Sequence, residues 1–411
     1  MRESHRLVPR ANLGVSTQVC DLQAHVTYQS HSQILSLKQS VVWSLCAPSN
    51  STVEQIIYQY ASLYPEISAG TAQRNVLSAI DYFRAQSLIT FAQLDAINYP
   101  LDVSSFSHFY TSRGGLYAIN KQGFLRLAYG MFFGITADDS GNLLVFDFPH
   151  KTTPLWRHSF SQAKQSATKA GIIRRFKLAN GKVHKPEDYC APVANNTHYL
   201  VLKDKELWGV DTEAQSIYRV GNDDGRSSSQ PSSLLQETPI LDQKEYHHIN
   251  SLAPTSNGWI VMKCIESTDN NQSSVAVLDQ SFKLIKSISI EGQRAHDLLN
   301  VEVNNGAESF WYCDSLNNHI RHHPSGDSVR IDRLWGEQLS VRGLSQTKQE
   351  WVVGSGAYGR YYDYIAWARM LGRVHFINKQ NNKLRHVVEV PEIPCCIISN
   401  PSFAGASLAD G

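Results

Sequence analysis

The sequence lacks the features that define several large protein classes. The 411-residue chain contains no run of about 18 apolar residues, so we expect no helix that spans a membrane. The opening residues contain no apolar core, which argues against a signal peptide. The seven cysteines are odd in number, and no CxxC pair occurs, which argues against a disulfide framework and against zinc ribbons. The sequence therefore predicts a cytoplasmic protein with free thiols.

Neither the charge nor the catalytic motifs of common enzyme families are present. The formal net charge is only +1, so the whole chain has no general attraction to nucleic acid or to anionic lipid. No GxSxG, HExxH or EF-hand pattern occurs. The Gly-rich stretch 354–360 has no Lys-Ser/Thr pair and no helix after it, so it does not predict a phosphate-binding loop. Function therefore has to be sought in the fold and in scattered side chains.

The first hundred residues read as three short extended runs followed by three helices. The extended runs are expected at residues 7–15, 25–29 and 34–38. A short apolar helix is expected at 40–45 and a second helix at 53–64. A third helix is expected to begin at Ser68 or Thr71 and to carry apolar residues at 3-4 spacing. Helical periodicity nearly disappears after about residue 99.

This order resembles the RiPP recognition element, the domain type of the pyrroloquinoline-quinone peptide chaperone. The segments that carry the resemblance are 6–10, 34–38, 42–46, 52–56 and 76–88. The resemblance implies a winged-helix-like domain that binds the leader of a ribosomally made precursor peptide as an added strand. The residues expected to line the groove are Ile34, Leu35, Ser36, Leu37 and Lys38 on the third strand, and Arg74, Leu77, Asp81 and Arg84 on the third helix.

Two other readings of this segment remain open: a winged helix that binds DNA, and a domain that only packs on its neighbour. Charge argues against DNA, because residues 1–100 hold six basic and six acidic side chains. A protein that reads DNA needs a basic face to neutralise phosphates. Peptide binding is the reading that we prefer.

The remaining three hundred residues read as a β-propeller of about six blades. Short apolar runs recur between Gly-, Asn-, Asp- and Ser-rich turns, and successive runs form repeated units. The expected organisation is a recognition domain at 1–95, a propeller at 96–400 and a flexible tail at 401–411. Residues 221–236 and 268–274 are expected to be surface loops, and residues 161–170 a short helix or lid.

The last units are similar to a family of bacterial propellers of unassigned function. The matching segments are His296-Asp297, 310–315, 342–344 and 352–355, and the resemblance spans about residues 245–395. It implies a fold and no activity.

Three polar residues open consecutive units, and they are the candidate catalytic residues: His248, His296 and Arg342. The first residues of successive blades are expected to face one another near the propeller axis. His248 and His296 could hold a divalent metal, for which zinc, copper and iron suit imidazole. Zinc enzymes normally use three protein ligands, and the sequence offers no obvious third. The remaining candidates are His247, His108, Cys395 and Cys396. A metal-free pocket and purely structural histidines stay open as alternatives.

Taken together, the expected recognition domain and the expected propeller predict a RiPP maturation protein. Its first domain would bind a precursor leader, and its propeller would modify the core peptide, with other maturation enzymes as further partners and no nucleic acid or membrane. Two alternatives are a non-catalytic adaptor that presents the precursor to another enzyme, and a propeller lyase or lactonase that acts on a small molecule.

Overall fold

A computed structural model describes most of the chain, and its description covers the following residues: 7–11, 16–20, 23–28, 31–46, 53–64, 66–86, 88–93, 97–112, 115–130, 132–147, 171–191, 193–194, 196–212, 214–221, 233–239, 247–265, 272–304, 306–331, 339–357, 372–390 and 393–402. The chain divides into two compact units, one built on Met1–Ile97 and the other on the strands that follow. Within the described part, no helix is long and apolar enough to cross a membrane.

The first unit contains three helices and five short strands. The helices are α1 (Leu37–Cys46), α2 (Val53–Leu63) and α3 (Ala69–Ala85). The strands are β1 (Leu7–Ala11), β2 (Ser16–Cys20), β3 (Gln23–Tyr28), β4 (His31–Ile34) and β5 (Ile89–Gln93). β1 pairs with β5, while β2, β3 and β4 form a separate antiparallel sheet in that order. Of the expected run at 7–15, the described residues form only β1, which ends at Ala11, and the strand β2 that begins at Ser16 was not predicted.

Apolar side chains from all three helices form the core of this unit. Trp43, Ile56, Val76 and Phe83 are each at most 1% exposed. Trp43 and Phe83 meet edge to face, with their ring centroids 5.2 Å apart. The helical periodicity of the sequence was thus a sound guide to α1, α2 and α3. Ser68, one of the two expected caps, is the N-cap of α3, because its hydroxyl accepts from the Thr71 amide.

The expected strand at 34–38 is wrong, because a helix begins inside it. The Ser36 hydroxyl accepts from the amide of Gln39, and the Gln39 side chain accepts from the amide of Ser36. This reciprocal capping box starts α1 at Leu37. The strand that the structure shows, β4, begins three residues earlier than expected and ends at Ile34. The short alternation at 34–37 is overridden by this local hydrogen bonding.

The second unit consists mainly of six four-stranded antiparallel sheets. Their strands are β7 (His108–Thr111), β8 (Gly115–Asn120), β9 (Gly123–Tyr129), β10 (Phe132–Ala137), β11 (Leu143–Asp147), β12 (Ile172–Phe176), β15 (Glu187–Cys190), β16 (Thr197–Lys203), β17 (Glu206–Asp211), β18 (Ser216–Gly221), β19 (Ser233–Pro239), β20 (Ile249–Thr255), β21 (Gly258–Lys263), β22 (Gln272–Asp279), β23 (Leu284–Gln293), β24 (His296–Asn304), β25 (Ala307–Asp314), β26 (His319–His323), β27 (Ser328–Arg330), β28 (Leu339–Gln346), β29 (Glu350–Ala357), β30 (Gly372–Asn378), β31 (Leu384–Val390) and β32 (Cys396–Ser399). A small additional sheet joins β6 (Leu101–Asp102), β13 (Leu178–Ala179) and β14 (Lys182–Val183).

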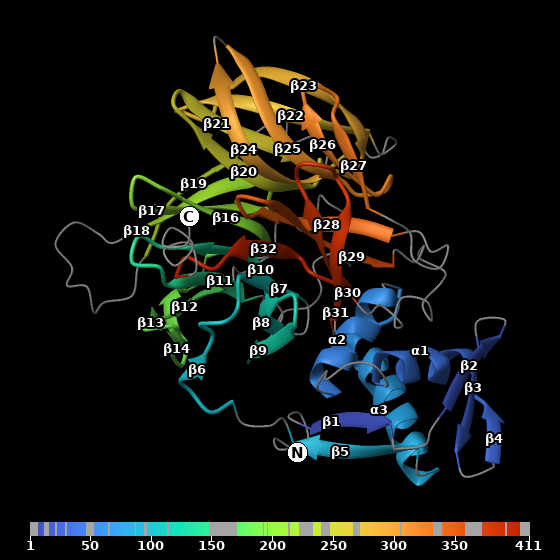
Figure 1. Cartoon of the computed structure of the whole chain (residues 1–411). Helices are drawn as coiled ribbons and strands as arrows, with labels where there is room; N and C mark the ends of the chain where they lie inside the picture. The colour runs from blue at the N-terminus through green and yellow to red at the C-terminus, as the bar shows by residue number, and fades with distance from the viewer. Residues whose placement is uncertain are drawn as a thin grey trace. The chain divides into compact units, whose positions relative to one another are not determined.

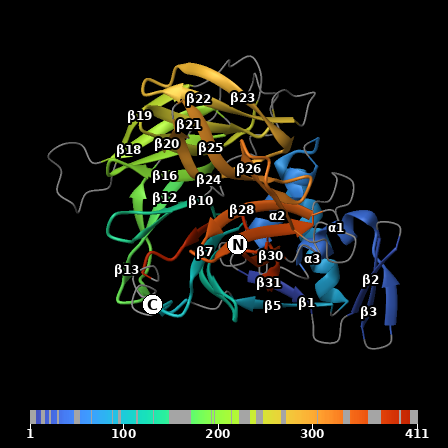
Figure 2. The ribbon, with the colours of Figure 1, turned by 45° about the horizontal axis from the view of Figure 1, so that its top comes forward.

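The six sheets form a closed ring. Each begins with an inner strand, and the inner strands contact one another in the cyclic order β10, β16, β20, β24, β28, β32 and back to β10. In Figure 1 the chain colours run around this unit from cyan through green and yellow to orange, and red β32 returns to its middle. Figure 2, in which the molecule is turned by 45°, shows the same succession of colours around this unit. This arrangement is a β-propeller.

The ring is closed by the two ends of the unit. β32, near the C-terminus, pairs with β7 and completes the sheet β32-β7-β8-β9. On sequence alone the run 387–398 reads as one C-terminal strand, and this prediction is wrong because the run is divided between β31 and β32, which belong to different sheets. The expected loops at 221–236 and 268–274 are also too long, since β19 begins at Ser233 and β22 begins at Gln272. The expected helix or lid at 161–170 lies outside the described residues.

Candidate metal centre

Three histidines and one arginine lie at the same end of four successive inner strands. His198 follows the first residue of β16, His248 directly precedes β20, His296 begins β24, and Arg342 lies in the first half of β28. Because these strands are neighbours around the ring, their leading ends converge. The rings of His248 and His296 lie 6.4 Å apart between centroids, and the charge of Arg342 lowers the pKa of both imidazoles.

The imidazoles of His248 and His296 meet the thiol of Cys264. One ligand atom of each residue lies within 4.8 Å of the other two. The Cys264 amide donates to the His248 carbonyl over 3.3 Å, so the residue after β21 stands directly beside the residue before β20. Cys264 is only 3% exposed. These three side chains are the residues that could hold a metal ion.

Hydrogen bonding sets the tautomer of His296. Its Nδ1 lies 2.8 Å from the carbonyl oxygen of Arg294 and 2.9 Å from the hydroxyl of Ser315. A carbonyl oxygen only accepts, so Nδ1 carries the proton and donates. The Ser315 hydroxyl donates its own proton to the Val341 carbonyl over 2.6 Å, which leaves it as an acceptor towards His296. The other nitrogen, Nε2, therefore keeps a free lone pair, which is the usual arrangement of a histidine that binds a metal.

His198 extends the row of rings to a third strand. It meets His248 edge to face at 5.2 Å and stacks on Phe133 at 5.2 Å, while His248 and His296 lie 6.4 Å apart between centroids. His198 is not among the predicted site residues, because the repeat pattern in the sequence places the start of its unit near residue 192, ahead of β16. The rule that selected His248 and His296, a histidine at the start of an inner strand, selects His198 once β16 is located.

Burial favours the uncharged form of all three side chains, whereas the nearby guanidinium groups favour it only for the two imidazoles. Burial lowers the pKa of His248 to about 4, helped by the charges of Arg342 and Arg294. The same causes, with burial first, hold the pKa of His296 well below its usual value. Burial also raises the pKa of the Cys264 thiol to about 12, against the opposing effect of the two arginines. Neutral imidazoles are the form that binds metals.

Arg342 and Asp297 make up the charged part of the same region. The Asp297 carboxylate accepts from the Gly343 amide over 2.8 Å, and burial raises its pKa to about 6 although Arg342 acts in the opposite direction. The Nε atom of Arg342 is fully enclosed and makes no hydrogen bond with any described residue. An enclosed guanidinium nitrogen without a partner is costly, and it is an available donor for an anion.

Each of the other third-ligand candidates contacts a different group. The His247 amide donates to the Gln215 side chain over 2.6 Å, and the fully buried His108 pairs its Nδ1 with the Ser107 hydroxyl at 2.9 Å. The Cys396 thiol lies 3.8 Å from the His198 carbonyl oxygen, and Cys395 is close to the carbonyl of residue 393. None of the four belongs to the three-residue group found among the described residues.

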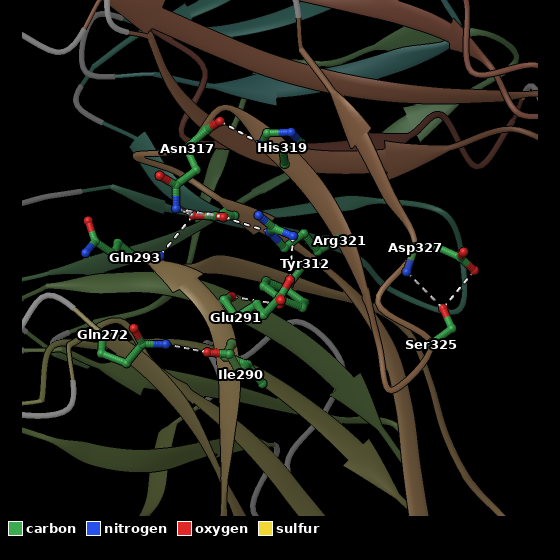
Figure 3. Close-up of polar contacts among 11 residues, drawn as sticks. Gln272, Ile290, Glu291, Gln293, Tyr312, Asn317, His319, Arg321, Ser325 and Asp327 are labelled. Atoms are coloured by element: carbon green, nitrogen blue, oxygen red, sulfur yellow. Dashed lines mark hydrogen bonds and ion pairs between the residues drawn. The ribbon is translucent and has the colours of Figure 1, made fainter.

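The histidine-rich tract 319–323 precedes a Pro-Ser-Gly sequence, which on sequence alone predicts a solvated turn, but its residues form the strand β26 and the turn follows it. Its imidazoles have separate partners. His319 donates through Nδ1 to the Asn317 carbonyl, and His323 stacks on Phe310 at 5.1 Å. Figure 3 shows the polar network beside it, where Arg321 reaches Glu291 and the fully buried Asp314. This tract stabilises the sheet and does not form a metal cluster.

The residues expected to line a peptide groove in the first unit are split between three elements. Ile34 ends β4, Leu35 and Ser36 follow it, and Leu37 and Lys38 begin α1. Leu35 is fully buried, whereas Ile34 and Leu37 are 60% and 49% exposed. The four predicted helix residues are all exposed on α3: Arg74, Leu77, Asp81 and Arg84.

Two surface hollows of about 500 and 430 Å³ lie at the other end of the inner strands. They share Lys203, Thr255 and Ser256, which stand at or just after the last residues of β16 and β20. The histidine cluster lies where those strands begin. The hollows are therefore separate from the candidate metal centre, and the chemistry of the side chains places the site at the cluster.

Comparison with known proteins adds the following. No family profile matches the chain, and no curated protein matches it. A nidogen/laminin complex structure matches with a TM-score of 0.46 and 9% identity, over 72% of this chain and 98% of that one. A protein from Lactobacillus plantarum matches with a TM-score of 0.41 and 10% identity, over 71% and 98%. The β-propeller domain of Cps50 (Swd1) from Myceliophteria thermophila matches with a TM-score of 0.33 and 11% identity, over 72% and 89%. Similarities of this strength carry no functional argument.

Proposed function

We propose that this chain is a maturation protein for a ribosomally made peptide. In this proposal the first unit is a winged-helix-like recognition domain that binds the precursor leader as an added strand. The propeller then modifies the core peptide at the cluster of His248, His296 and Arg342. The observation that carries the proposal is the outer edge of β4, which pairs with no further strand in the described part of the chain and is flanked by exposed apolar side chains.

The edge of β4 has backbone groups available for another strand. β4 is an outer strand of the sheet β2-β3-β4. The Leu35 amide donates to the Ala24 carbonyl over 2.9 Å, so the position just after β4 is bonded inward to β3. Hydrogen-bonded pairs alternate along an antiparallel ladder, so the main-chain groups of Ser32 and Ile34 point outward. An extended peptide could therefore add to this edge.

Apolar side chains beside the edge supply the second requirement, which is specificity. Ile34, Leu37 and Leu77 are three of the large apolar side chains that are exposed in the described part of the chain. Side-chain pockets next to a shared strand are what select a peptide. The Tyr82 hydroxyl donates to the Gln33 side chain over 2.9 Å, so α3 and β4 are joined directly. Arg74, Asp81 and Arg84 offer charge of both signs on the same helix.

Holding the leader would concentrate the core peptide near the propeller. A tether of this kind raises the effective concentration of the attached segment to about the millimolar range without any new contact at the reacting site. The axial cluster has the convergent polar groups that a binding or catalytic site needs. This supports modification of the peptide in preference to recognition alone.

The test uses fluorescein-labelled synthetic peptides encoded by short reading frames next to the gene. Binding is measured by fluorescence anisotropy, and conversion by mass spectrometry. Ile34→Pro removes an outward-pointing amide and should therefore weaken leader binding at least 10-fold. The variant should still fold, because edge strands tolerate proline. Leu35→Pro is unsuitable, since it breaks a bond inside the sheet and replaces a buried side chain.

A control separates the edge from general surface hydrophobicity. Phe124, on β9 of the propeller, is 42% exposed, so Phe124→Ser should bind the leader like the wild type. Equal binding by folded Ile34→Pro protein would reject strand addition. Binding without any conversion of the core peptide would leave the protein as an adaptor.

A further inference from the structure

We propose that His248, Cys264 and His296 bind one zinc ion, and that the ion's remaining coordination position and Arg342 together take a carboxylate. The ligand set includes a cysteine that sequence patterns did not single out. The proposal concerns the propeller alone and does not depend on peptide recognition by the first unit.

The donor set suits zinc. Two imidazole nitrogens and one thiolate are soft to borderline ligands of the kind that zinc binds. Their ligand atoms already lie within 4.8 Å of one another. Zinc bonds of about 2.0–2.3 Å would bring such atoms roughly 3.5 Å apart, so side-chain movements on the order of 1 Å complete the site. Three protein ligands leave one tetrahedral position for another group.

The backbone holds the three ligands in place before any ion arrives. The bond between the Cys264 amide and the His248 carbonyl fixes two of them side by side. The third, His296, is oriented by the Arg294 carbonyl and the Ser315 hydroxyl, both on its Nδ1. Outer hydrogen bonds of this type orient metal-binding imidazoles and set their tautomers.

The charge around the cluster requires an anion as well. Arg342 acts electrostatically on each of the three ligand residues. A divalent ion, one thiolate, the Arg342 guanidinium and the Asp297 carboxylate together still carry one surplus positive charge, which is costly in a buried setting. An anion at the open coordination position would offset it. The enclosed Nε of Arg342, which has no hydrogen bond among the described residues, can donate to that anion.

A carboxylate is the anion class that fits best. Its two oxygens can be shared between a metal and a guanidinium, and arginine pairs with carboxylates in a fixed planar geometry. The side chain or C-terminus of a peptide would supply such a group, and so would a small organic acid. The site would thus hold the substrate by its carboxylate.

Cobalt(II) is the probe for the metal, because a cobalt–thiolate bond gives a charge-transfer band in the near-ultraviolet. Purified full-length protein should bind one equivalent of cobalt with this band, and zinc should displace it. Cys264→Ser should remove the band and weaken metal binding at least 10-fold. His296→Gln should weaken binding similarly while keeping the thiolate band at high cobalt concentration.

Cys313→Ser is the matched control. Cys313 stands opposite His296 in the next sheet, as Cys264 stands opposite His248, but its side chain contacts Asp297. This variant should bind cobalt like the wild type. Failure of the wild type to bind one equivalent of zinc or cobalt would overturn the site, and so would a thiolate band that survives Cys264→Ser.

A measurement without substitutions guards against variants that do not fold. X-ray absorption on zinc-loaded wild-type protein should show one sulfur and two imidazole nitrogens in the first shell. A shell without sulfur, or with two sulfurs, would contradict this ligand set.

Acetate tests the anion half of the proposal. Adding acetate to the cobalt-loaded wild type should shift its visible bands, and Arg342→Gln should need at least 10-fold more acetate for the same shift. Arg385→Gln is the control, because Arg385 is exposed and lies 3.5 Å from Glu350. An acetate response that is unchanged in Arg342→Gln would overturn the role of Arg342. If cobalt binds as expected but no leader peptide binds, the proposed function fails while this inference stands.

Discussion

In the sheet that contains β20 and β21, His248 stands opposite Cys264, and in the next sheet, with β24 and β25, His296 stands opposite Cys313. The residue types and their positions in the repeat are the same. Their contacts differ, because the Cys264 thiol faces both imidazoles whereas the Cys313 thiol bonds to the Asp297 carboxylate. Both thiols are buried, and burial is the first cause that raises the pKa of each.

The backbone explains why equivalent residues diverge. In the first sheet His248 itself has a positive φ of 47°. In the second, the positive values fall on Arg294 (51°) and Asp297 (64°), on either side of His296. Both inner strands also shift register just after the histidine. A residue in the left-handed region redirects the side chains around it. The position in the propeller repeat therefore determines where each histidine lies, and the local backbone conformation determines which groups its side chain contacts.

The largest expected effect is on peptide conversion. His248→Ala, His296→Ala and Arg342→Ala should each lower conversion of the precursor about 100-fold or more, because groups at a reacting centre contribute on the order of 10²–10⁴-fold. With a chelator present, their melting temperatures should stay close to that of the wild type. Conversion and thermal melting measured on the same preparations test this, with Cys313→Ser as the variant that should keep activity. Full conversion by all three alanine variants would end the assignment of this region as the active site.

Much of the fold could be predicted from the sequence, because its signals are local. Turn residues separate the strands of each hairpin, as at Asp138, whose carboxylate accepts from the amides of Ser140 and Asn142 while Gly141 adopts a φ of 79°. Ser68 and the apolar spacing that follows it similarly predicted α3. The boundaries of β4 and α1 were missed where the capping pair of Ser36 and Gln39 outweighs a short alternation.

The candidate site could be predicted only in part, because its remainder depends on pairing between strands. His248 and His296 mark the starts of repeats, a position that can be read along the chain. Cys264 reaches them only through the register of β20 and β21, which joins Ile249 to Lys263 and brings the following cysteine beside His248. No spacing rule links residues 248 and 264, since the hairpin length between them is not fixed by sequence. The sequence also places tyrosine and arginine residues at 358–364, for which a peptide-contacting rim and an ordinary exposed loop are equally expected, and this stretch lies outside the described residues.

The next largest expected effect is on the free energy of unfolding. It concerns Asp297, whose contact with Cys313 distinguishes the second sheet. Asp297→Ala should destabilise the protein by about 2–3 kcal/mol, because the Gly343 amide loses a charged acceptor inside the core. Denaturant unfolding measures this change. Asp279→Ala, which removes a carboxylate from an exposed turn, should cause a clearly smaller loss. Equal losses in the two variants would mean that Asp297 has no special structural role in the second sheet.

A comparable effect should follow from adding zinc. A ligand that binds only the folded state at about 100 times its dissociation constant stabilises by roughly 2.7 kcal/mol. Zinc should therefore raise the melting temperature of the wild type and of Cys313→Ser, and leave that of Cys264→Ser nearly unchanged. Differential scanning fluorimetry with and without a chelator tests it. A zinc response in Cys264→Ser equal to that of the wild type would remove the functional difference between the two cysteines.

The smallest expected effect is on the pH dependence of stability and concerns His375, a buried histidine outside the candidate metal centre. Its titration shows how much acid sensitivity a structural histidine contributes, for comparison with His248 and His296. His375 on β30 is 1% exposed, its Nε2 lies 2.7 Å from the Ser355 hydroxyl, and burial together with the charge of Arg373 lowers its pKa to about 4. The unfolded chain therefore binds the proton more readily between pH 6.5 and 4. The stabilisation is complete above pH 6.5 and is lost as pH falls through that window. His375→Gln keeps a hydrogen-bonding group for Ser355 and removes the titration, so its stability should fall less than that of the wild type between pH 7.5 and 5, by on the order of 1–2 kcal/mol. Urea unfolding at the two pH values measures both slopes. Identical slopes would show that His375 does not contribute to acid sensitivity, and the loss at low pH would then have to come from other buried groups, the axial histidines among them.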